Sequence, residues 1–282
     1  MTTTIGLIAP GEMGAAVAAA VTDPRARVVW ASHGRSDDTR RRASGAGIED
    51  VGDLADLVTA SDVMLSICPP HAAAEVAEEV AAHGFRGCYV DANAVSPDTA
   101  RSIDATVARG GAAYVDGGIV GGPPRQPGTT RLYLAGDDAI GIAALFADGP
   151  LEAVALDGGV PAASALKMAY AGWTKGSAAL LLSIRALAAA EGVEADLLAE
   201  WTRSLPDLAG RSDRAATSGG RKGWRWVGEM DEIAASLDAA GLPGGFHEAA
   251  AEVYRRLSPL RDATDDTTAT RAIEALLHPE EH

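Results

Sequence analysis

The first fourteen residues constrain the fold of this chain more strongly than any other segment. Thr4–Ile8 is a short apolar run of strand length, and Met13–Val21 is an alanine-rich stretch with helical character. A strand that runs through a glycine turn into a helix is the fingerprint of a dinucleotide-binding βαβ unit. Here alanine replaces its first glycine, and we expect the turn residues to bind the cofactor: Ala9, Pro10, Gly11, Glu12, Met13 and Gly14. Gly11 lets the backbone approach a pyrophosphate, and Gly14 lets the helix pack on the strand.

The rest of the first half alternates apolar runs with helical stretches. Strands separated by helices of this length form βαβ units, so we expect an α/β fold with a doubly wound parallel sheet of the Rossmann type. The later strands are predicted at Arg27–Ala31, Val63–Ile67, Cys88–Asp91, Tyr114–Asp116 and Arg131–Ala135, with helices at Leu54–Ala60 and Ala72–Ala82. Asp91 and Asp116, at strand ends, are expected to orient backbone turns.

The second half shows only helical periodicity. The glycines at 158 and 159 are the natural boundary, which predicts a dinucleotide-binding domain over 1–157 and an all-α domain over 158–282. Its helices are predicted at Ala162–Ala190, Glu194–Ser204, Trp226–Ala240, Phe246–Leu257 and Thr264–Leu277, the first being a long interdomain helix. Arg211–Lys222, rich in Arg, Ser and Gly, is expected to be a mobile loop.

Charge and composition limit the partners of the chain. A formal net charge of −15 repels polyphosphate, so we expect neither nucleic acid nor an anionic membrane as partner. Two cysteines, without partners at metal-ligand spacing, indicate neither a disulfide framework nor a metal site. The first residues lack a basic segment followed by an apolar one, so we expect no signal peptide and a cytoplasmic protein.

The end of the second predicted strand indicates which cofactor binds. An NAD site usually has a carboxylate at this position for the ribose hydroxyls, whereas an NADP site has hydroxyls and arginine for the extra phosphate. The chain has no carboxylate at this strand end; Ser32, Arg35 and Ser36 follow it instead. These residues predict a phosphate cradle and NADP(H) as cofactor. The arginines at 40, 41 and 42 fit the cradle or a solvated helix face equally well.

Further motifs make a family resemblance specific. Gly6–Gly14 resembles the opening of the β-hydroxyacid dehydrogenase superfamily, which includes 6-phosphogluconate and 3-hydroxyisobutyrate dehydrogenases. Four later segments resemble further motifs of that superfamily in the same order: Ile67–Pro70, Asp91–Pro97, Asp116–Gly122 and Gly128–Thr129. The segments 166–176 and 241–247 are similar to a helical C-terminal domain of poorly characterised members, so the resemblance covers nearly the whole chain.

The resemblance implies roles for several residues, and the chain departs from it at others. Cofactor contacts are implied for Cys68, Pro69, Pro70 and Asn93, and substrate contacts for Val120, Gly121 and Gly122. Lys167 falls at the position of the catalytic lysine. Val120 replaces a substrate-binding serine, Ala171 replaces an asparagine, and Gly228-Glu229 stand in place of a Lys-Asp pair. These departures put the ordinary 3-hydroxyacid substrates in question.

Hydride transfer to a carbonyl needs a proton donor or acceptor at the oxygen. Lys167 is predicted to fill that role, and Tyr170, on the same helical face with Thr174, is the alternative acid. His247 is either a helix cap or surface residue, or a residue of the substrate pocket together with Thr174. Arg131 could bind a substrate anion or form a salt bridge.

The leading functional prediction is an NADP(H)-dependent oxidoreductase for a small carbonyl or hydroxyacid, with Lys167 as general acid/base. An imine reductase is the alternative within enzymes, because that group shares the scaffold and varies the lysine position. A nicotinamide-binding regulator without catalysis is the alternative outside enzymes. The long helix over 162–190 is apolar on more than one side, which predicts a homodimer with this helix at the interface.

Overall fold

The computed structural model describes residues 2–262 and 269–279. The chain divides into two compact units, unit 1 (residues 1–168) and unit 2 (residues 169–282). The division falls within α7 (Ala162–Ala190), which the sequence predicted with the same bounds. The domain boundary predicted between 157 and 158 precedes this helix and stays a prediction.

Unit 1 is built on one eight-stranded sheet with the order β3-β2-β1-β4-β5-β6-β7-β8. The first six strands in this order are parallel, β7 runs antiparallel to β6, and β8 runs parallel to β7. The strands are β1 (Thr3–Ile8), β2 (Ala26–Trp30), β3 (Glu49–Asp50), β4 (Val63–Ser66), β5 (Cys88–Asp91), β6 (Ala113–Val120), β7 (Thr130–Ala135) and β8 (Leu151–Ala155).

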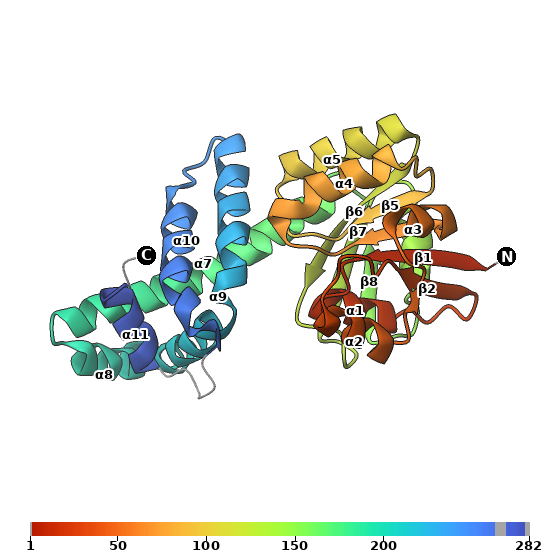
Figure 1. Ribbon diagram of the computed structural model, residues 1–282. Coiled ribbons are helices and arrows are strands. Elements are labelled where there is room, and N and C mark those ends of the chain that lie inside the picture. Colours follow the sequence, from red (N-terminus) through yellow and green to blue (C-terminus); the bar gives the residue numbers. More distant parts are fainter. Residues whose placement is uncertain (1, 263–268, 280–282) are drawn as a thin grey trace. The chain divides into compact units, whose positions relative to one another are not determined.

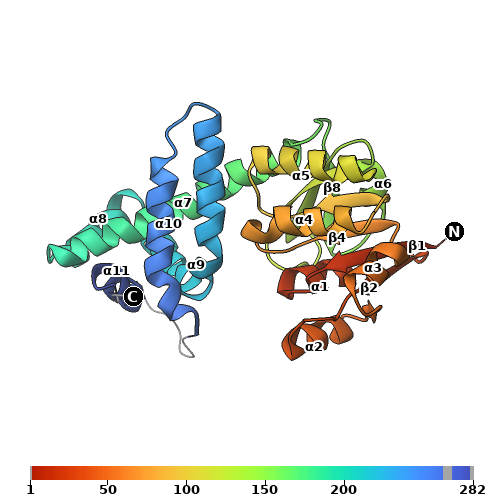
Figure 2. The ribbon, with the colours of Figure 1, turned by 45° about the horizontal axis from the view of Figure 1, so that its top comes forward.

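Helices cover both faces of this sheet (Figures 1 and 2), which confirms the doubly wound fold. One apolar core lies between the sheet and α1, α2 and α6, and a second lies between the sheet and α3, α4 and α5. These helices are α1 (Glu12–Ala19), α2 (Asp37–Gly45), α3 (Leu54–Ala60), α4 (Ala73–Ala82), α5 (Pro97–Gly110) and α6 (Ala139–Ala144). A short 3-10 helix, Pro70–Ala72, precedes α4.

Three strands of unit 1 differ from the prediction. β3 was missed because it has two residues, both charged and exposed, so it carries no apolar signal. β8 was also missed. β6 is longer than predicted and runs through Gly117 and Gly118, so Asp116 lies inside this strand and not at its end. The prediction that Asp116 ends a strand was therefore wrong.

Every described element of unit 2 is a helix, with turns between them. After α7 come α8 (Glu194–Ser204), α9 (Leu208–Ala239), α10 (Gly245–Leu257), a 3-10 turn over 258–262, and α11 (Ala269–Leu277). The helices α9 and α10 run side by side (Figures 1 and 2). The part of the last predicted helix between 264 and 268 lies outside the described residues.

The predicted mobile loop over 211–222 was wrong, because this segment lies inside α9. Small residues in this part of α9 recur every three or four positions and are buried: Ser212, Ala215, Ala216, Gly219, Gly220 and Gly223. A Cβ at Gly223 would lie 3.1 Å from the ring of Tyr254 on α10. The glycines therefore serve close helix packing and do not indicate a flexible chain.

Buried charges in unit 2 are paired between helices. Arg185 on α7 is 5% exposed and donates hydrogen bonds to Glu194 at 2.7 Å, Asp213 at 2.6 Å and Ser212 at 2.9 Å. Lys175, also on α7, forms an ion pair with Glu229 on α9. Across the described part of the chain, no helix is both long enough and apolar enough to span a bilayer.

Candidate functional site

The turn after β1 adopts the fingerprint conformation although it begins with alanine. Ala9 has a φ of 56°, in the left-handed region that glycine adopts without steric cost, and its carbonyl accepts a hydrogen bond from the Gly11 N–H at 2.7 Å. A Cβ at Gly14 would lie 3.0 Å from the same carbonyl oxygen. Gly14 is thus needed for close packing of α1 on the turn, as its place in the motif predicted.

Gly11 is not needed for folding, which makes it informative about a ligand. Its φ of −66° suits any residue, and an added Cβ would meet only the Ala9 carbonyl at 3.9 Å. It is also the N-cap of α1 and, because glycine has no side chain, it offers no side-chain acceptor to the first N–H groups of that helix. Open space and helix N–H groups therefore occur together at this turn, an arrangement that fits a dinucleotide pyrophosphate. Pro10, Glu12 and Met13 complete the turn.

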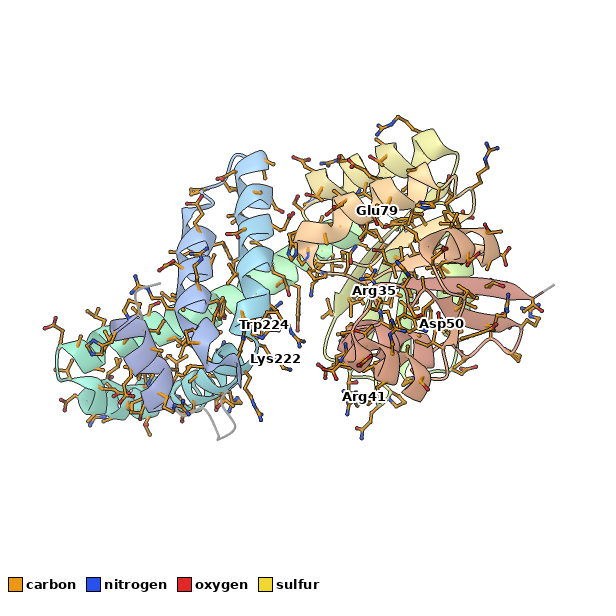
Figure 3. The ribbon with its side chains drawn as sticks, viewed as in Figure 1. Arg35, Arg41, Asp50, Glu79, Lys222 and Trp224 are labelled. Atoms are coloured by element: carbon orange, nitrogen blue, oxygen red, sulfur yellow. The ribbon has the colours of Figure 1, made fainter. Side chains whose placement is uncertain are left out.

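A pocket of about 190 Å³ lies next to the turn, at the ends of β1 and β2. Its walls are mostly apolar and come from the two strand ends and from α3 and α4. They comprise Leu7, Ile8, Ala9, Ala31, His33, Arg35, Leu54, Leu57, Val76, Glu79 and Val80. Arg35 and Glu79, both marked in Figure 3, are its charged lining residues. An apolar slot beside a phosphate-binding turn can hold the adenosine half of a dinucleotide.

Of the three predicted cradle residues, only Arg35 lines this pocket. Ser32 is 9% exposed, and its backbone N–H donates to the Asp50 carboxylate at 3.2 Å. Ser36 is the N-cap of α2, and its hydroxyl accepts from the Thr39 N–H at 3.3 Å. The Ser36 hydroxyl is thus engaged at the start of α2, and the Ser32 backbone is engaged with Asp50.

The arginines after Ser36 already contact the protein. Arg40 donates to the Arg35 carbonyl at 3.3 Å, Arg41 pairs with Asp38, and Arg42 donates to the Pro10 carbonyl at 3.4 Å. The bond from Arg42 ties α2 to the fingerprint turn. These contacts place positive charge near the turn.

A buried polar network joins the ends of β4 and β5. The Asn93 side chain accepts a hydrogen bond from the Cys68 N–H at 2.6 Å and donates to the Ser66 hydroxyl at 3.1 Å. Asn93 is only 3% exposed. It therefore holds the start of the loop that continues through Pro69 and Pro70, the segment for which the family resemblance implied cofactor contacts.

Asp91 lies beneath this network and is fully buried. Burial, followed by the nearby charge of Asp116, raises the pKa of Asp91 to about 7, although hydrogen bonds from Asn93 oppose the shift. Its carboxylate accepts the Asn93 N–H at 3.0 Å. Asp91 thus orients the turn after β5, as predicted. Burial also raises the pKa of the Cys68 thiol to about 11, so this cysteine stays protonated at neutral pH.

Lys167 lies against β6, because glycine allows α7 to come close. A Cβ at Gly118 would lie 3.1 Å from the Cβ of Lys167 and 2.7 Å from the Ala163 carbonyl. The start of α7 is fixed by Asp116, whose carboxylate accepts from the Ser164 N–H at 2.9 Å and from its hydroxyl at 2.5 Å. Asp116 therefore anchors the lysine helix, a role that its predicted place at a strand end did not suggest.

The predicted substrate turn follows directly on the same strand. Val120 ends β6 and is 5% exposed, and Gly121 has a φ of 118°. The Thr130 hydroxyl donates to the Gly122 carbonyl at 2.6 Å and closes the hairpin. Lys167 and this turn therefore both lie along the last residues of β6. Arg131, on the other arm of the hairpin, forms a salt bridge with Glu152 at 3.4 Å.

The remaining predicted site residues belong to unit 2. Tyr170 is 50% exposed, and the Thr174 hydroxyl donates to its carbonyl at 3.0 Å. The His247 ring lies on α7, with Nε2 3.1 Å from the Gly172 carbonyl. His247 is the third residue of α10, whose N-cap is Gly244, so it is not the cap of that helix. Within the described ranges, no cluster of three or more His, Cys, Asp or Glu side chains could hold a metal ion.

Two families match separate parts of the chain. The family described as the NAD binding domain of 6-phosphogluconate dehydrogenase matches residues 4–140. A domain of unknown function, DUF1932, matches residues 188–257 in unit 2. The first match contains the fingerprint turn, the pocket and the buried network of β4 and β5.

Known proteins resemble the chain over most of its length. An uncharacterised 28.5 kDa protein from the 7S RNA 5′ region of Methanothermus fervidus is 31% identical over 195 residues, 69% of this chain and 74% of that protein. A solved protein of unknown function, described as structurally similar to 3-hydroxyacid dehydrogenases, is 26% identical with a TM-score of 0.68 over 92% of this chain and 98% of its own. The Mycobacterium tuberculosis 3-hydroxyisobutyrate dehydrogenase shares the fold, with 17% identity and a TM-score of 0.69 over 99% and 100% of the two chains.

These matches agree with the order of motifs along the sequence. The dinucleotide-binding match covers the sheet from β1 to β7, and the second match runs from the last residues of α7 through α8, α9 and α10. The chain belongs to the family of proteins that carry an NAD binding domain of 6-phosphogluconate dehydrogenase ahead of a DUF1932 domain, which confirms the resemblance to the β-hydroxyacid dehydrogenase superfamily.

Proposed function

We propose that this protein is an NADP(H)-dependent oxidoreductase that transfers hydride to or from a small carbonyl or hydroxyacid substrate. The observation that carries the proposal is the close contact of Lys167 with Gly118, beside the 120–122 turn and in the unit that matches an NAD binding domain. A lysine at this position can meet a substrate oxygen held by the turn. The bound cofactor supplies or accepts the hydride.

The cofactor would be held by the open turn and the pocket. The N–H groups at the start of α1 and the space left by Gly11 suit the pyrophosphate, and the 190 Å³ pocket suits the adenosine. We propose Arg35 as the main contact for a 2′-phosphate, since it lines the pocket. Ser32 and Ser36 are secondary candidates because neither lines the pocket, and the Ser36 hydroxyl already caps α2. Asn93 and the 68–70 loop would border the nicotinamide.

Lys167 is the proposed general acid/base at the substrate oxygen. Its helix is anchored by the two hydrogen bonds from Ser164 to Asp116, so the lysine backbone is fixed relative to β6. An anchored proton donor contributes roughly 10²–10⁴ in rate. Tyr170, with its half-exposed side chain, is the alternative acid, and Thr174 and His247 are proposed to line the substrate site.

The test begins with a screen of carbonyls, hydroxyacids and cyclic imines against NADPH and NADP. With a substrate found, Lys167→Ala should lower turnover roughly 10²–10⁴-fold while NADPH affinity changes by only a few-fold. Lys167→Arg should be nearly as damaging, because arginine stays charged and cannot exchange the proton. Tyr170→Phe is the control and should remain active. Loss of turnover in Tyr170→Phe with activity kept in Lys167→Ala would reverse the assignment.

The screen also separates the alternative functions. Turnover of cyclic imines but not of carbonyls or hydroxyacids would favour an imine reductase, which the replacements at Val120 and Ala171 allow. Tight NADPH binding without turnover across the whole panel would favour a non-catalytic regulator.

We also propose a homodimer through α7. Apolar side chains recur along one face of this helix at spacings of three, seven, four and three residues, and in unit 2 they are exposed. They are Tyr170 (50%), Trp173 (69%), Leu180 (45%), Ile184 (39%) and Leu187 (58%). Spacings of three, four and seven residues are those of a heptad seam that packs against another helix, in which Ser177 occupies the remaining position. No Asp or Glu occurs between 158 and 190, so two strongly acidic copies could meet here without carboxylate repulsion.

Light scattering at micromolar concentration should give twice the monomer mass. Leu180→Glu should shift the protein to the monomer, because it places a charge in the seam. Ile140→Glu is the matched control, since Ile140 is 76% exposed but lies on α6 in unit 1. A wild-type protein that stays monomeric would contradict the dimer.

A further inference from the structure

A carboxylate that the sequence did not single out lies at the edge of the proposed cofactor site. Asp50 ends β3 and pairs in register with Trp30, the last residue of β2. Because these strands run parallel to β1, their carboxyl ends lie at the same sheet edge as the fingerprint turn. Asp50 and Arg35 are both marked in Figure 3.

Hydrogen bonds connect Asp50 to the wall of the pocket. One oxygen accepts the N–H of Ser32 at 3.2 Å and the N–H of Gly52 at 2.9 Å. The Gly52 carbonyl in turn accepts the N–H of His33 at 2.9 Å. Ala31 and His33, which flank Ser32, both line the pocket. The carboxylate is therefore fixed one residue away from the pocket wall, next to the strand end where Rossmann folds hold the adenosine ribose.

The charge of Asp50 is present at neutral pH. Burial alone would raise its pKa, but hydrogen bonds from Ser32 and Gly52 and the charge of Arg40 outweigh that effect and hold the pKa below its usual value. Asp50 is thus an anion beside a pocket that Arg35 lines, and it also experiences the positive charge of Arg40. Glu79 also lines the pocket, but it comes from α4 and not from the strand end.

An anion at this point acts differently on the two nicotinamide cofactors. NADH has a ribose 2′-hydroxyl that can donate a hydrogen bond to a carboxylate, whereas NADPH has a phosphate that a carboxylate repels. We propose that Asp50 determines the cofactor preference, limiting the NADPH preference that Arg35 creates and keeping NADH as a second cofactor. This inference rests on the proposed function and names the residue that sets its specificity.

Calorimetric titration of the full chain with NADPH and with NADH tests the proposal. Asp50→Asn keeps an oxygen that accepts from Ser32 and Gly52 but removes the charge. We expect the ratio of NADH Kd to NADPH Kd to rise about tenfold, with NADPH binding tighter and NADH weaker. The gain in NADPH affinity should shrink at high salt, because it is a charge effect.

Glu49→Gln is the matched control. Glu49 is the neighbouring carboxylate on β3, and it pairs with Arg27 at 3.1 Å. Glu49→Gln removes the same charge as Asp50→Asn, but from an exposed ion pair that does not contact the pocket wall. The ratio of NADH Kd to NADPH Kd should therefore stay within about twofold of the wild-type value. Asp50→Ser, which is neutral and shorter, replaces the asparagine variant if the amide lowers the melting temperature of the protein.

The outcomes separate this inference from the proposed function. A wild type that binds neither dinucleotide overturns both. A wild type that binds, with an unchanged ratio in Asp50→Asn, overturns the inference alone. Equal weakening of both cofactors also overturns it, because Asp50 would then only support the turn. A change in Glu49→Gln as large as in Asp50→Asn would assign the effect to overall charge.

Discussion

Glycine has different roles in the two units. In unit 1, Gly14 and Gly118 let a helix approach backbone, with added Cβ atoms 3.0 Å and 2.7 Å from carbonyl oxygens. In unit 2, Gly176 and Gly223 sit within helices and face rings, with added Cβ atoms 2.9 Å from His247 and 3.1 Å from Tyr254. In unit 1 the close approach positions the fingerprint turn and the start of α7, which carries Lys167. In unit 2 it brings helices close enough to form a core from few large side chains.

Buried charge differs between the units in the same way. In unit 1 the buried carboxylates of Asp91 and Asp116 accept hydrogen bonds from N–H and hydroxyl groups at the sheet edge. In unit 2 the buried charges of Arg185 and Lys175 are paired with carboxylates on other helices. Unit 1 thus concentrates polar groups near a candidate site, and unit 2 uses them to tie helices together.

The largest effect should come from breaking the charge cluster of unit 2. Arg185→Ala removes the donor to the half-buried carboxylate of Glu194, the exposed carboxylate of Asp213 and the buried hydroxyl of Ser212, so we expect a loss of about 3–5 kcal/mol in unfolding free energy. Urea denaturation of the full chain measures it. Arg41→Ala, which removes an exposed ion pair with Asp38, should change stability by less than about 0.5 kcal/mol. Comparable losses of unfolding free energy in Arg185→Ala and Arg41→Ala would show that the buried charges of unit 2 do not stabilise it more than exposed ion pairs stabilise unit 1.

The next effect concerns the buried acid of unit 1. The pKa of Asp91 rises from 3.8 to about 7 on folding, so between these values the folded protein binds more protons than the unfolded chain. Its contribution to stability is therefore lost as pH rises from about 4 to 7. Asp91→Asn does not titrate, and its stability relative to wild type should grow by on the order of 2–4 kcal/mol over this range.

Urea unfolding at several pH values measures this change. Asp98→Asn is the control, since Asp98 is an exposed acid beside Arg101. A stability difference for Asp91→Asn that stays flat from pH 4 to 8 would contradict a carboxyl group that titrates near neutral pH.

A smaller effect compares two glycines within the helices of unit 2. Gly176→Ala pushes a methyl group against the His247 ring, which costs about 1–3 kcal/mol and outweighs the roughly 1 kcal/mol gain in helix propensity. Gly228→Ala meets no atom within 4 Å and should gain about 1 kcal/mol. Thermal unfolding of both variants should therefore give opposite signs. Two stabilised variants would show that the helices around Gly176 separate easily.

The smallest effect concerns the first turn of unit 1. Ala9→Gly removes the steric cost of a left-handed alanine, about 1–2 kcal/mol. Glycine also raises the conformational entropy of the unfolded chain, which opposes this gain, so the free energy of unfolding should rise by up to about 1 kcal/mol. Gly111→Ala is the reverse control, because Gly111 has a φ of 91° and should lose about 1 kcal/mol. A destabilised Ala9→Gly would mean that the methyl group makes favourable contacts.

The sequence predicted most of unit 1 because its signals are local. Apolar runs separated by helices locate β1, β4 and β5 to within a residue, and the fingerprint locates the start of α1. The two-residue β3 depends on backbone pairing with β2, which no apolar pattern records. For this reason the bond between Ser32 and Asp50 could not be foreseen. The Glu49-Asp50 pair before a Val-Gly turn could at most have indicated a short edge strand.

In unit 2 the lengths of α7 and α8 followed from periodicity, but α9 did not. Its glycines looked like breaks in the helix, and only the position of Tyr254 on another helix explains them. Within the proposed site, the motif order predicted Lys167 near the start of the long helix and a turn over 120–122, and these residues lie in α7 and at the end of β6. The close approach of α7 to β6 depends on Gly118, which the sequence did not indicate. The anchoring role of Asp116 depends on β6 extending beyond its predicted end.

The buried thiols of unit 1 have a practical consequence for following its motions. Burial raises the pKa of Cys68 to about 11 and that of Cys88 to about 12, so neither is a thiolate at neutral pH. Alkylating labels react with the thiolate, so modification should wait for local opening of the sheet edge. Cys68 follows β4 and belongs to the Asn93 network through its N–H, whereas Cys88 begins β5 and pairs in register with Val63 at the other end of these strands. The labelling rates of the two cysteines therefore report separately, without any added probe, how often each end of β4 and β5 opens.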